Sequence, residues 1–137
     1  MLRITQTLID DMIEHAFRDH PIECCGMLVG PVGSGRPERH IPLPNAAASP
    51  TFFEFSSADV LRVYREMDAR DEEPVVIYHS HTSSVAYPSR TDRAYASEPD
   101  AHYVIVSTRH GRAGPEVRAF LIRGDEVEEE PIEITEP

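Results

Sequence analysis

The sequence predicts a mixed α/β fold, a mixed β-sheet flanked by helices, and three observations support this prediction. Short apolar segments of strand character alternate with segments whose apolar residues recur at helical spacing. The length of 137 residues suits one compact core, so we expect residues 1–137 to form a single domain. No internal repeat or low-complexity linker divides the chain.

In the first half, a helix is followed by short strands and then by another helix. Apolar residues at helical spacing predict an amphipathic helix over residues 6–19. Residues 26–30 and 40–43 predict two strands joined by a glycine- and proline-rich turn, and residues 52–55 are expected to be extended. Ser57 is expected to cap the second helix. The inner face of that helix is predicted to be Val60, Leu61, Tyr64 and Met67.

The second half supplies the central strand. Residues 75–78 are mostly β-branched and are apolar at every position, the pattern of a buried strand, and they run directly into His79 and His81. A loop and a short helix beginning at Ser89 are expected to follow. Further strands are predicted at residues 103–107, 117–122 and 127–134.

Composition excludes several classes of function. The formal net charge of -11 and the lack of a basic patch argue against nucleic-acid binding. No apolar run is long enough to cross a bilayer, and the first residues do not resemble a secretory signal, so we expect a cytoplasmic protein without membrane contact. The acidic run within residues 126–133 is expected to be a solvated edge.

Both cysteines and five of the seven histidines are expected to have structural roles. Cys24 and Cys25 are adjacent and have no clear general-base partner, so we expect them to pack as small hydrophobic residues in a reducing compartment. The histidines that lack ligand spacing are expected at the surface or at the edge of the core. These are His15, His20, His40, His102 and His110.

The motif His79-Ser80-His81 is the first indication of a metal site. Residues two apart in a strand point to the same face about 6.6 Å apart, so both imidazoles can reach one cation. On its own the motif is weak evidence for metal binding, because two histidines can also form a polar end of a strand without any ion. More support comes from an aspartate that follows in the next helix.

Asp92 is the natural third ligand. A loop of seven residues separates His81 from Ser89, and Asp92 follows three positions later, in a helix that returns toward the strand end. Ser89 and Asp92 also fit a capping box, and both interpretations can hold together. Two imidazoles and one carboxylate leave a fourth tetrahedral position for water, which is typical of a catalytic zinc site.

These residues resemble the signature of the JAMM or MPN-type metallopeptidases. That signature is an upstream glutamate, then His-x-His, seven residues, Ser, two residues and Asp, and residues 79–92 match its second half. Residues 21–30 are similar to the glutamate-bearing entry into the family's first core strand. The resemblance implies a JAB/MPN fold, which is cytidine-deaminase-like, and one Zn²⁺ per chain. It also implies Glu23 as the catalytic base and Ser89 as a donor to the oxyanion.

The resemblance extends to a small bacterial branch of this family, whose members release cysteine from the C-terminus of a sulfur-carrier protein. It is carried by residues 20–31, 36–40, 74–82, 86–92 and 98–103. The implied partner is a small ubiquitin-like sulfur carrier with a glycine-rich C-terminus, and the implied process is cysteine biosynthesis. Two alternatives remain, a deubiquitinase-like isopeptidase and a non-catalytic MPN scaffold. The scaffold is disfavoured because all the ligand residues of the signature are present. The isopeptidase is disfavoured because the chain has no obvious insertion that could bind a second protein.

Overall fold

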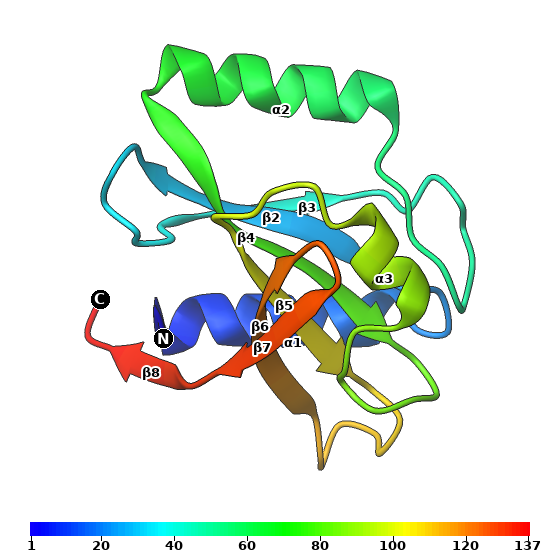
Figure 1. Cartoon of the computed structure of the whole chain (residues 1–137). Helices are drawn as coiled ribbons and strands as arrows, with labels where there is room; N and C mark the ends of the chain where they lie inside the picture. Colours follow the sequence, from blue (N-terminus) through cyan, green and yellow to red (C-terminus); the bar gives the residue numbers. More distant parts are fainter.

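A computed structural model describes residues 1–137 as one six-stranded sheet with helices on both faces and a separate strand pair (Figure 1). The predicted α/β class is confirmed. The elements in chain order are β1 (Leu2–Thr5), α1 (Gln6–Asp19), β2 (Cys25–Pro31), β3 (Arg39–Leu43), α2 (Ser57–Ala69), β4 (Glu72–His81), α3 (Arg90–Tyr95), β5 (His102–Ser107), β6 (Glu116–Arg123), β7 (Glu126–Glu130) and β8 (Ile132–Thr135).

The six-stranded sheet has the order β3-β2-β4-β5-β6-β7. Strands β4 and β5 run parallel, whereas every other neighbouring pair in this sheet is antiparallel. Strand β4 has ten residues and lies between β2 and β5, and its last seven residues are all buried. The predicted central strand is therefore confirmed, and it carries His79 and His81 into the interior.

Helices α1 and α2 cover opposite faces of the sheet (Figure 1). Met12 of α1 belongs to the same core cluster as Tyr78, whereas Met67 of α2 belongs to a second cluster with Ile77. Because side chains alternate along a strand, His79 projects on the α2 side with Ile77. None of the helices combines the length and the apolar character needed to span a membrane.

The start and the buried stripe of α2 differ from the sequence prediction. Ser56 is the N-cap, because its hydroxyl accepts the N–H of Asp59 at 3.1 Å, and Ser57 is the first helical residue. Leu61 is 52% exposed, so its predicted place on the inner face is wrong, whereas Val63 is buried. The stripe that is at least partly buried consists of Val60, Val63, Tyr64 and Met67.

The strand predicted over residues 127–134 is interrupted at Pro131. Strand β7 pairs with β6, whereas β8 leaves the sheet and pairs in parallel with β1, a strand that the sequence did not predict. Proline has no backbone N–H to donate to a neighbouring strand. The Pro131 carbonyl, however, accepts the N–H of Leu2 at 3.0 Å. Glu130 is buried and lies 2.7 Å from His102 Nδ1, so one member of the acidic run is not solvated.

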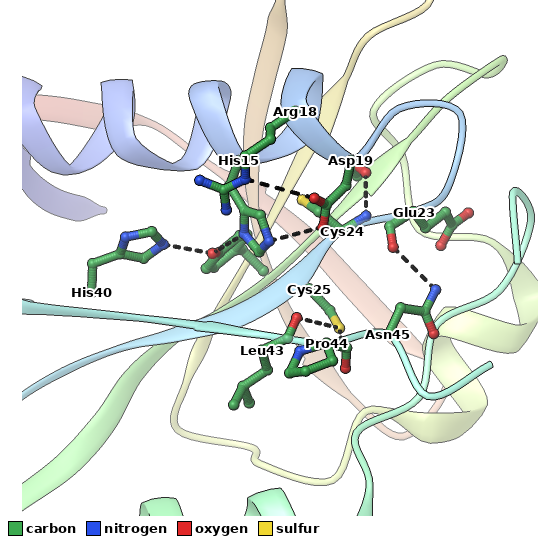
Figure 2. Close-up of polar contacts among 12 residues, drawn as sticks. His15, Arg18, Asp19, Glu23, Cys24, Cys25, His40, Leu43, Pro44 and Asn45 are labelled. Atoms are coloured by element: carbon green, nitrogen blue, oxygen red, sulfur yellow. Dashed lines mark hydrogen bonds and ion pairs between the residues drawn. The ribbon is translucent and has the colours of Figure 1, made fainter. Parts of the chain in front are cut away.

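His15 and Tyr78 form a polar contact inside the core, so the expectation that His15 lies at the surface or core edge is wrong. The Tyr78 hydroxyl lies 2.6 Å from Nδ1 of His15 and 2.6 Å from Nε2 of His40. On its other side, His15 Nε2 lies 3.1 Å from Asp19, and Figure 2 labels both of these residues. A Cβ at Gly26 would lie 2.6 Å from the same hydroxyl oxygen, so the network requires glycine there.

Candidate metal centre

The end of β4 carries the two histidines that the sequence predicts as metal ligands. Because alternate residues of a strand share a face, His79 and His81 project from the same side of the sheet. Both side chains are buried. Their Nε2 atoms lie 3.2 Å apart, so one cation beside them can contact both nitrogens.

Asp92 joins the two histidines from the first turn of α3. Its Oδ2 atom lies 3.2 Å from Nε2 of His79 and 3.0 Å from Nε2 of His81. The ligand atoms of the three residues all lie within 4.8 Å of one another, and no other trio of histidine, cysteine, aspartate or glutamate does so. The structure thus brings the three predicted ligands together.

The capping box expected from Ser89 and Asp92 is present. The Ser89 hydroxyl accepts the backbone N–H of Asp92 at 3.0 Å, and the Asp92 carboxylate accepts the N–H of Ser89 at 2.8 Å. The carboxylate oxygen in this bond is the same Oδ2 that faces both imidazoles. The box therefore fixes the carboxylate against the strand end, and capping leaves the same oxygen facing both imidazoles.

The two imidazoles are oriented by different contacts. Nδ1 of His81 lies 2.8 Å from the carbonyl oxygen of Val85. A carbonyl can only accept, so Nδ1 carries a proton, and Nε2 is the nitrogen that a cation at this site could contact. The His79 ring instead stacks on Phe53, with centroids 4.4 Å apart and planes inclined by 21°.

Burial and mutual hydrogen bonding set the charges of the three side chains. Burial lowers the pKa of His79. Burial also acts to lower the pKa of His81, but hydrogen bonds to Asp92 and to the Val85 carbonyl outweigh it, and this pKa is raised. Burial alone would raise the pKa of Asp92, yet the hydrogen bonds with both imidazoles hold it well below its usual value. Two imidazoles and an ionised carboxylate are a donor set that fits a zinc ion.

Glu23 lies at the same end of the sheet. Cys25 is opposite His79, and Cys24 exchanges hydrogen bonds with Ser80, so continuation of this register sets Glu23 beside His81. The Glu23 side chain is 5% exposed, and its Oε1 atom has no hydrogen-bond partner. Burial raises its pKa to about 7, with His81 lowering and Asp92 raising it.

A cavity of about 370 Å³ opens beside His79 and Asp92, two of the three predicted ligands. Most of its lining is hydrophobic, and Phe53, Tyr95 and Ile105 contribute to its walls. His79 and Asp92 form part of its polar edge, and no arginine lines it. An apolar side chain that enters this cavity would be desolvated next to two of the predicted ligands.

Residues 5–123 match the family described as prokaryotic homologs of the JAB domain, or Prok-JAB. The chain belongs to this family. A curated protein similar to this Prok-JAB chain is the CysO-cysteine peptidase of Mycobacterium tuberculosis (strain ATCC 25618 / H37Rv). It is 54% identical over 136 residues, which cover 99% of this chain and 92% of that protein.

Two further comparisons agree with the Prok-JAB assignment. The desampylase of Haloferax volcanii is 32% identical over 123 residues, covering 82% of this chain and 88% of that protein. A solution structure of a protein from Desulfitobacterium hafniense has a TM-score of 0.87 and 31% identity, covering 100% of this chain and 94% of that one. The fold and family that the sequence resemblance implied are confirmed.

The cysteines of the Prok-JAB chain do not join this group of ligands. Cys24 and Cys25 are fully buried, as expected, and burial raises the pKa of each thiol to about 12. The Cys25 sulfur contacts the Leu43 carbonyl at 3.7 Å. Both thiols therefore stay protonated and pack in the interior.

Sequence reasoning missed two residues beside the Prok-JAB centre, Phe53 and Asn45. Both belong to the irregular segment 44–55, in which the predicted extended run 52–55 forms no strand. Asn45 is the only asparagine of the chain and follows a proline, which is a turn signal. That signal predicts a turn but not the residues that the amide contacts.

Proposed function

We propose that this chain is a zinc-dependent peptidase that releases cysteine from the C-terminus of a small ubiquitin-like sulfur-carrier protein. The observation that carries the proposal is the convergence of His79, His81 and Asp92 beside the buried carboxyl of Glu23. The 54% identity to the CysO-cysteine peptidase over nearly the full chain supports the substrate class.

One zinc ion per chain would be held by His79, His81 and Asp92. When bound, zinc supplies Lewis acidity, which polarises the scissile carbonyl and makes water a better nucleophile at neutral pH. Three protein donors rather than four suit a catalytic site better than a structural one. The chain's own core, with α1 and α2 on the two faces of the sheet, makes the fold independent of the ion.

Glu23 is proposed as the catalytic base. Its carboxylate takes a proton from the attacking water, whose oxygen bonds to the carbonyl carbon of the scissile peptide. It then gives that proton to the nitrogen of the leaving cysteine as the C–N bond breaks. Its partnerless Oε1 atom supports this role, because no other side chain of the protein occupies the proton-accepting oxygen.

Ser89 is proposed to stabilise the oxyanion that forms on the carbonyl oxygen. Its hydroxyl oxygen already accepts the N–H of Asp92, which leaves the hydroxyl proton available to donate. The same group can therefore cap α3 and assist the reaction.

The carrier is proposed to contribute a folded body and an extended glycine-rich tail. The tail would lie as an added strand and bring its last peptide bond to the metal centre. The net charge of -11 disfavours nucleic acid as a partner, and the adjacent cysteines favour a reducing cytoplasm.

The 32% identity to a desampylase favours one alternative, cleavage of a lysine-linked conjugate of a ubiquitin-like protein. Mass spectrometry after incubation with a carrier–cysteine adduct and, separately, with a lysine-linked conjugate distinguishes the two. We expect the zinc-loaded protein to contain near one zinc per chain and to shorten the adduct by one cysteine. Chelator-treated protein should remain folded and inactive.

Cleavage of the conjugate alone would replace the proposed substrate with an isopeptide. Cleavage of neither would favour a non-catalytic scaffold. Full activity of verified metal-free protein would reject the role of zinc.

A further inference from the structure

We propose that Asn45 is a positioning residue of this reaction, because it ties the backbone of Glu23 to the loop that covers His79. The inference rests on the proposed role of Glu23 as the base. It concerns a residue that touches neither the metal ligands nor the substrate, and that acts by holding Glu23 in place.

The Asn45 side chain uses its full hydrogen-bonding capacity. Its Nδ2 group donates to the Glu23 carbonyl at 3.0 Å and to the Phe52 carbonyl at 2.8 Å (Figure 2 shows the bond to Glu23). Its Oδ1 atom accepts the N–H of Ala47 at 3.0 Å and of Glu54 at 3.1 Å. A side-chain amide can donate two hydrogen bonds and accept two, so Asn45 has no unused hydrogen-bonding capacity.

Glu23 depends on this loop for its placement. Oε1 has no partner, so the carboxyl group is positioned mainly by its backbone. On one side the Glu23 N–H donates to the Ser49 carbonyl at 3.0 Å, and on the other its carbonyl accepts from Asn45. Both anchors come from segment 44–55.

The same segment is fixed against the metal ligands. The Thr82 hydroxyl donates to the Pro50 carbonyl at 3.0 Å, immediately after His81. Phe53 stacks on His79. Asn45 therefore couples the position of Glu23 to a loop that is itself held against His79 and against Thr82, the residue after His81.

A loop-forming role alone would account for three of these four bonds, because the donor bond to Phe52 also stays inside segment 44–55. The acceptor bonds from Ala47 and Glu54 stay within the loop, and the first is an Asx-type turn. The donor bond to Glu23 crosses 22 positions of sequence and serves no turn. Asn45→Asp keeps both acceptor functions and loses both donors, so it breaks the bond to Glu23 together with the bond to Phe52. The Glu23→Gln background then separates an effect through Glu23 from an effect on the loop alone.

The test compares Asn45→Asp with wild type, with Glu23→Gln and with the double variant, in zinc-loaded protein and with the carrier–cysteine adduct. We expect Asn45→Asp to keep near one zinc per chain and an unchanged KM, whereas kcat falls about 10- to 100-fold. In the Glu23→Gln background the same change should have no further effect, since the group it positions is already lost. Thr51→Ala, which removes an exposed side-chain contact with Ser49 in the same loop, is the matched control and should keep kcat.

Equal losses of kcat in both backgrounds would overturn the inference, because a general structural effect does not depend on Glu23. If kcat is unchanged in Asn45→Asp but is largely lost in Glu23→Gln, the inference about Asn45 is overturned while the proposed role of Glu23 stands. Unchanged kcat in Glu23→Gln would overturn the proposed base and the inference with it. If Asn45→Asp fails to fold, Asn45→Gln replaces it, with about a tenfold expected loss that again vanishes in the Glu23→Gln background.

Discussion

The ring of Phe53 lies face to face with the imidazole of His79, with centroids 4.4 Å apart and planes inclined by 21°. Phe53 belongs to the irregular segment 44–55, whereas His79 ends a buried strand. One predicted ligand is therefore oriented by an aromatic stack, and its neighbour His81 by a backbone carbonyl.

Phe53→Ala should weaken zinc binding. An aromatic pair contributes about 0.5–1.5 kcal/mol beyond area burial, so the dissociation constant should rise about two- to tenfold. Competition with a chromophoric chelator measures this change. Phe52→Ala is the control, because the Phe52 ring contacts Tyr95 and not His79. Equal zinc affinity in wild type and Phe53→Ala would show that the stack does not support the ligand.

Asp92→Ala and Glu23→Gln should separate metal binding from proton transfer. Asp92→Ala removes one of three donors, so zinc and activity should both be lost. Glu23→Gln leaves the donors intact and should retain zinc, while kcat falls about 10²- to 10⁴-fold. Zinc content by atomic absorption and single-turnover kinetics give the two readouts. Comparable zinc loss in both variants would make Glu23 a ligand rather than a base.

Ser89→Ala should affect both stability and catalysis. Loss of the N-cap should cost about 1 kcal/mol of unfolding free energy. Loss of the proposed oxyanion donor should lower kcat about 10²- to 10³-fold, with zinc retained. Ser89→Thr keeps a hydroxyl and should recover most of the stability. A variant that lost stability but kept kcat would leave capping as the only role of Ser89.

Burial of two histidines should make the metal-free protein less stable as the pH falls below about 6.5, whereas the raised pKa of Glu23 acts in the opposite direction over the same range. Burial lowers the folded-state pKa of His15 and of His40 below that of an unfolded imidazole. As the pH falls, the unfolded chain takes up protons that the folded chain does not, so the unfolding free energy decreases toward the folded-state pKa. The charge of Asp19 acts to raise the pKa of His15, and that of Asp11 acts to raise the pKa of His40. Arg18 acts to lower both pKa values.

Urea unfolding at several pH values from about 7.5 to about 5 measures the effect. The variant His40→Gln removes one of the two histidine contributions, so a fall in pH should lower its unfolding free energy less than that of wild type. Identical pH dependence in the two proteins would assign the effect to other groups. The metal-free state avoids competition between protons and zinc for His79 and His81.

The parts of the fold that follow local periodicity could be predicted from the sequence. The helix expected over residues 6–19 is α1, because its apolar stripe is continuous, and residues 75–78 lie within β4. The loop length between His81 and Ser89 and the spacing to Asp92 likewise predicted that Asp92 lies beside the two histidines. Each of these patterns lies within a short stretch of chain.

Features that depend on distant partners could not be predicted. The contact of His15 with Tyr78 joins residues 63 positions apart, and the bond from Asn45 to Glu23 joins residues 22 positions apart. Strand β8 is assigned by its pairing with β1 at the opposite end of the sequence. Local propensity carries no information about such pairings, because they are decided by the packing of the whole sheet.

The pairing of β1 with β8 also determines how the molecule should respond to mechanical force. The two strands run parallel, and their registered pairs extend from Leu2 with Ile132 to Thr5 with Thr135. Tension applied between the two ends of the chain pulls these strands in opposite directions along their length. The inter-strand hydrogen bonds are then loaded together in shear rather than opened one at a time. The short pair should therefore act as a mechanical clamp that protects the sheet carrying His79 and His81 when the two ends are pulled apart.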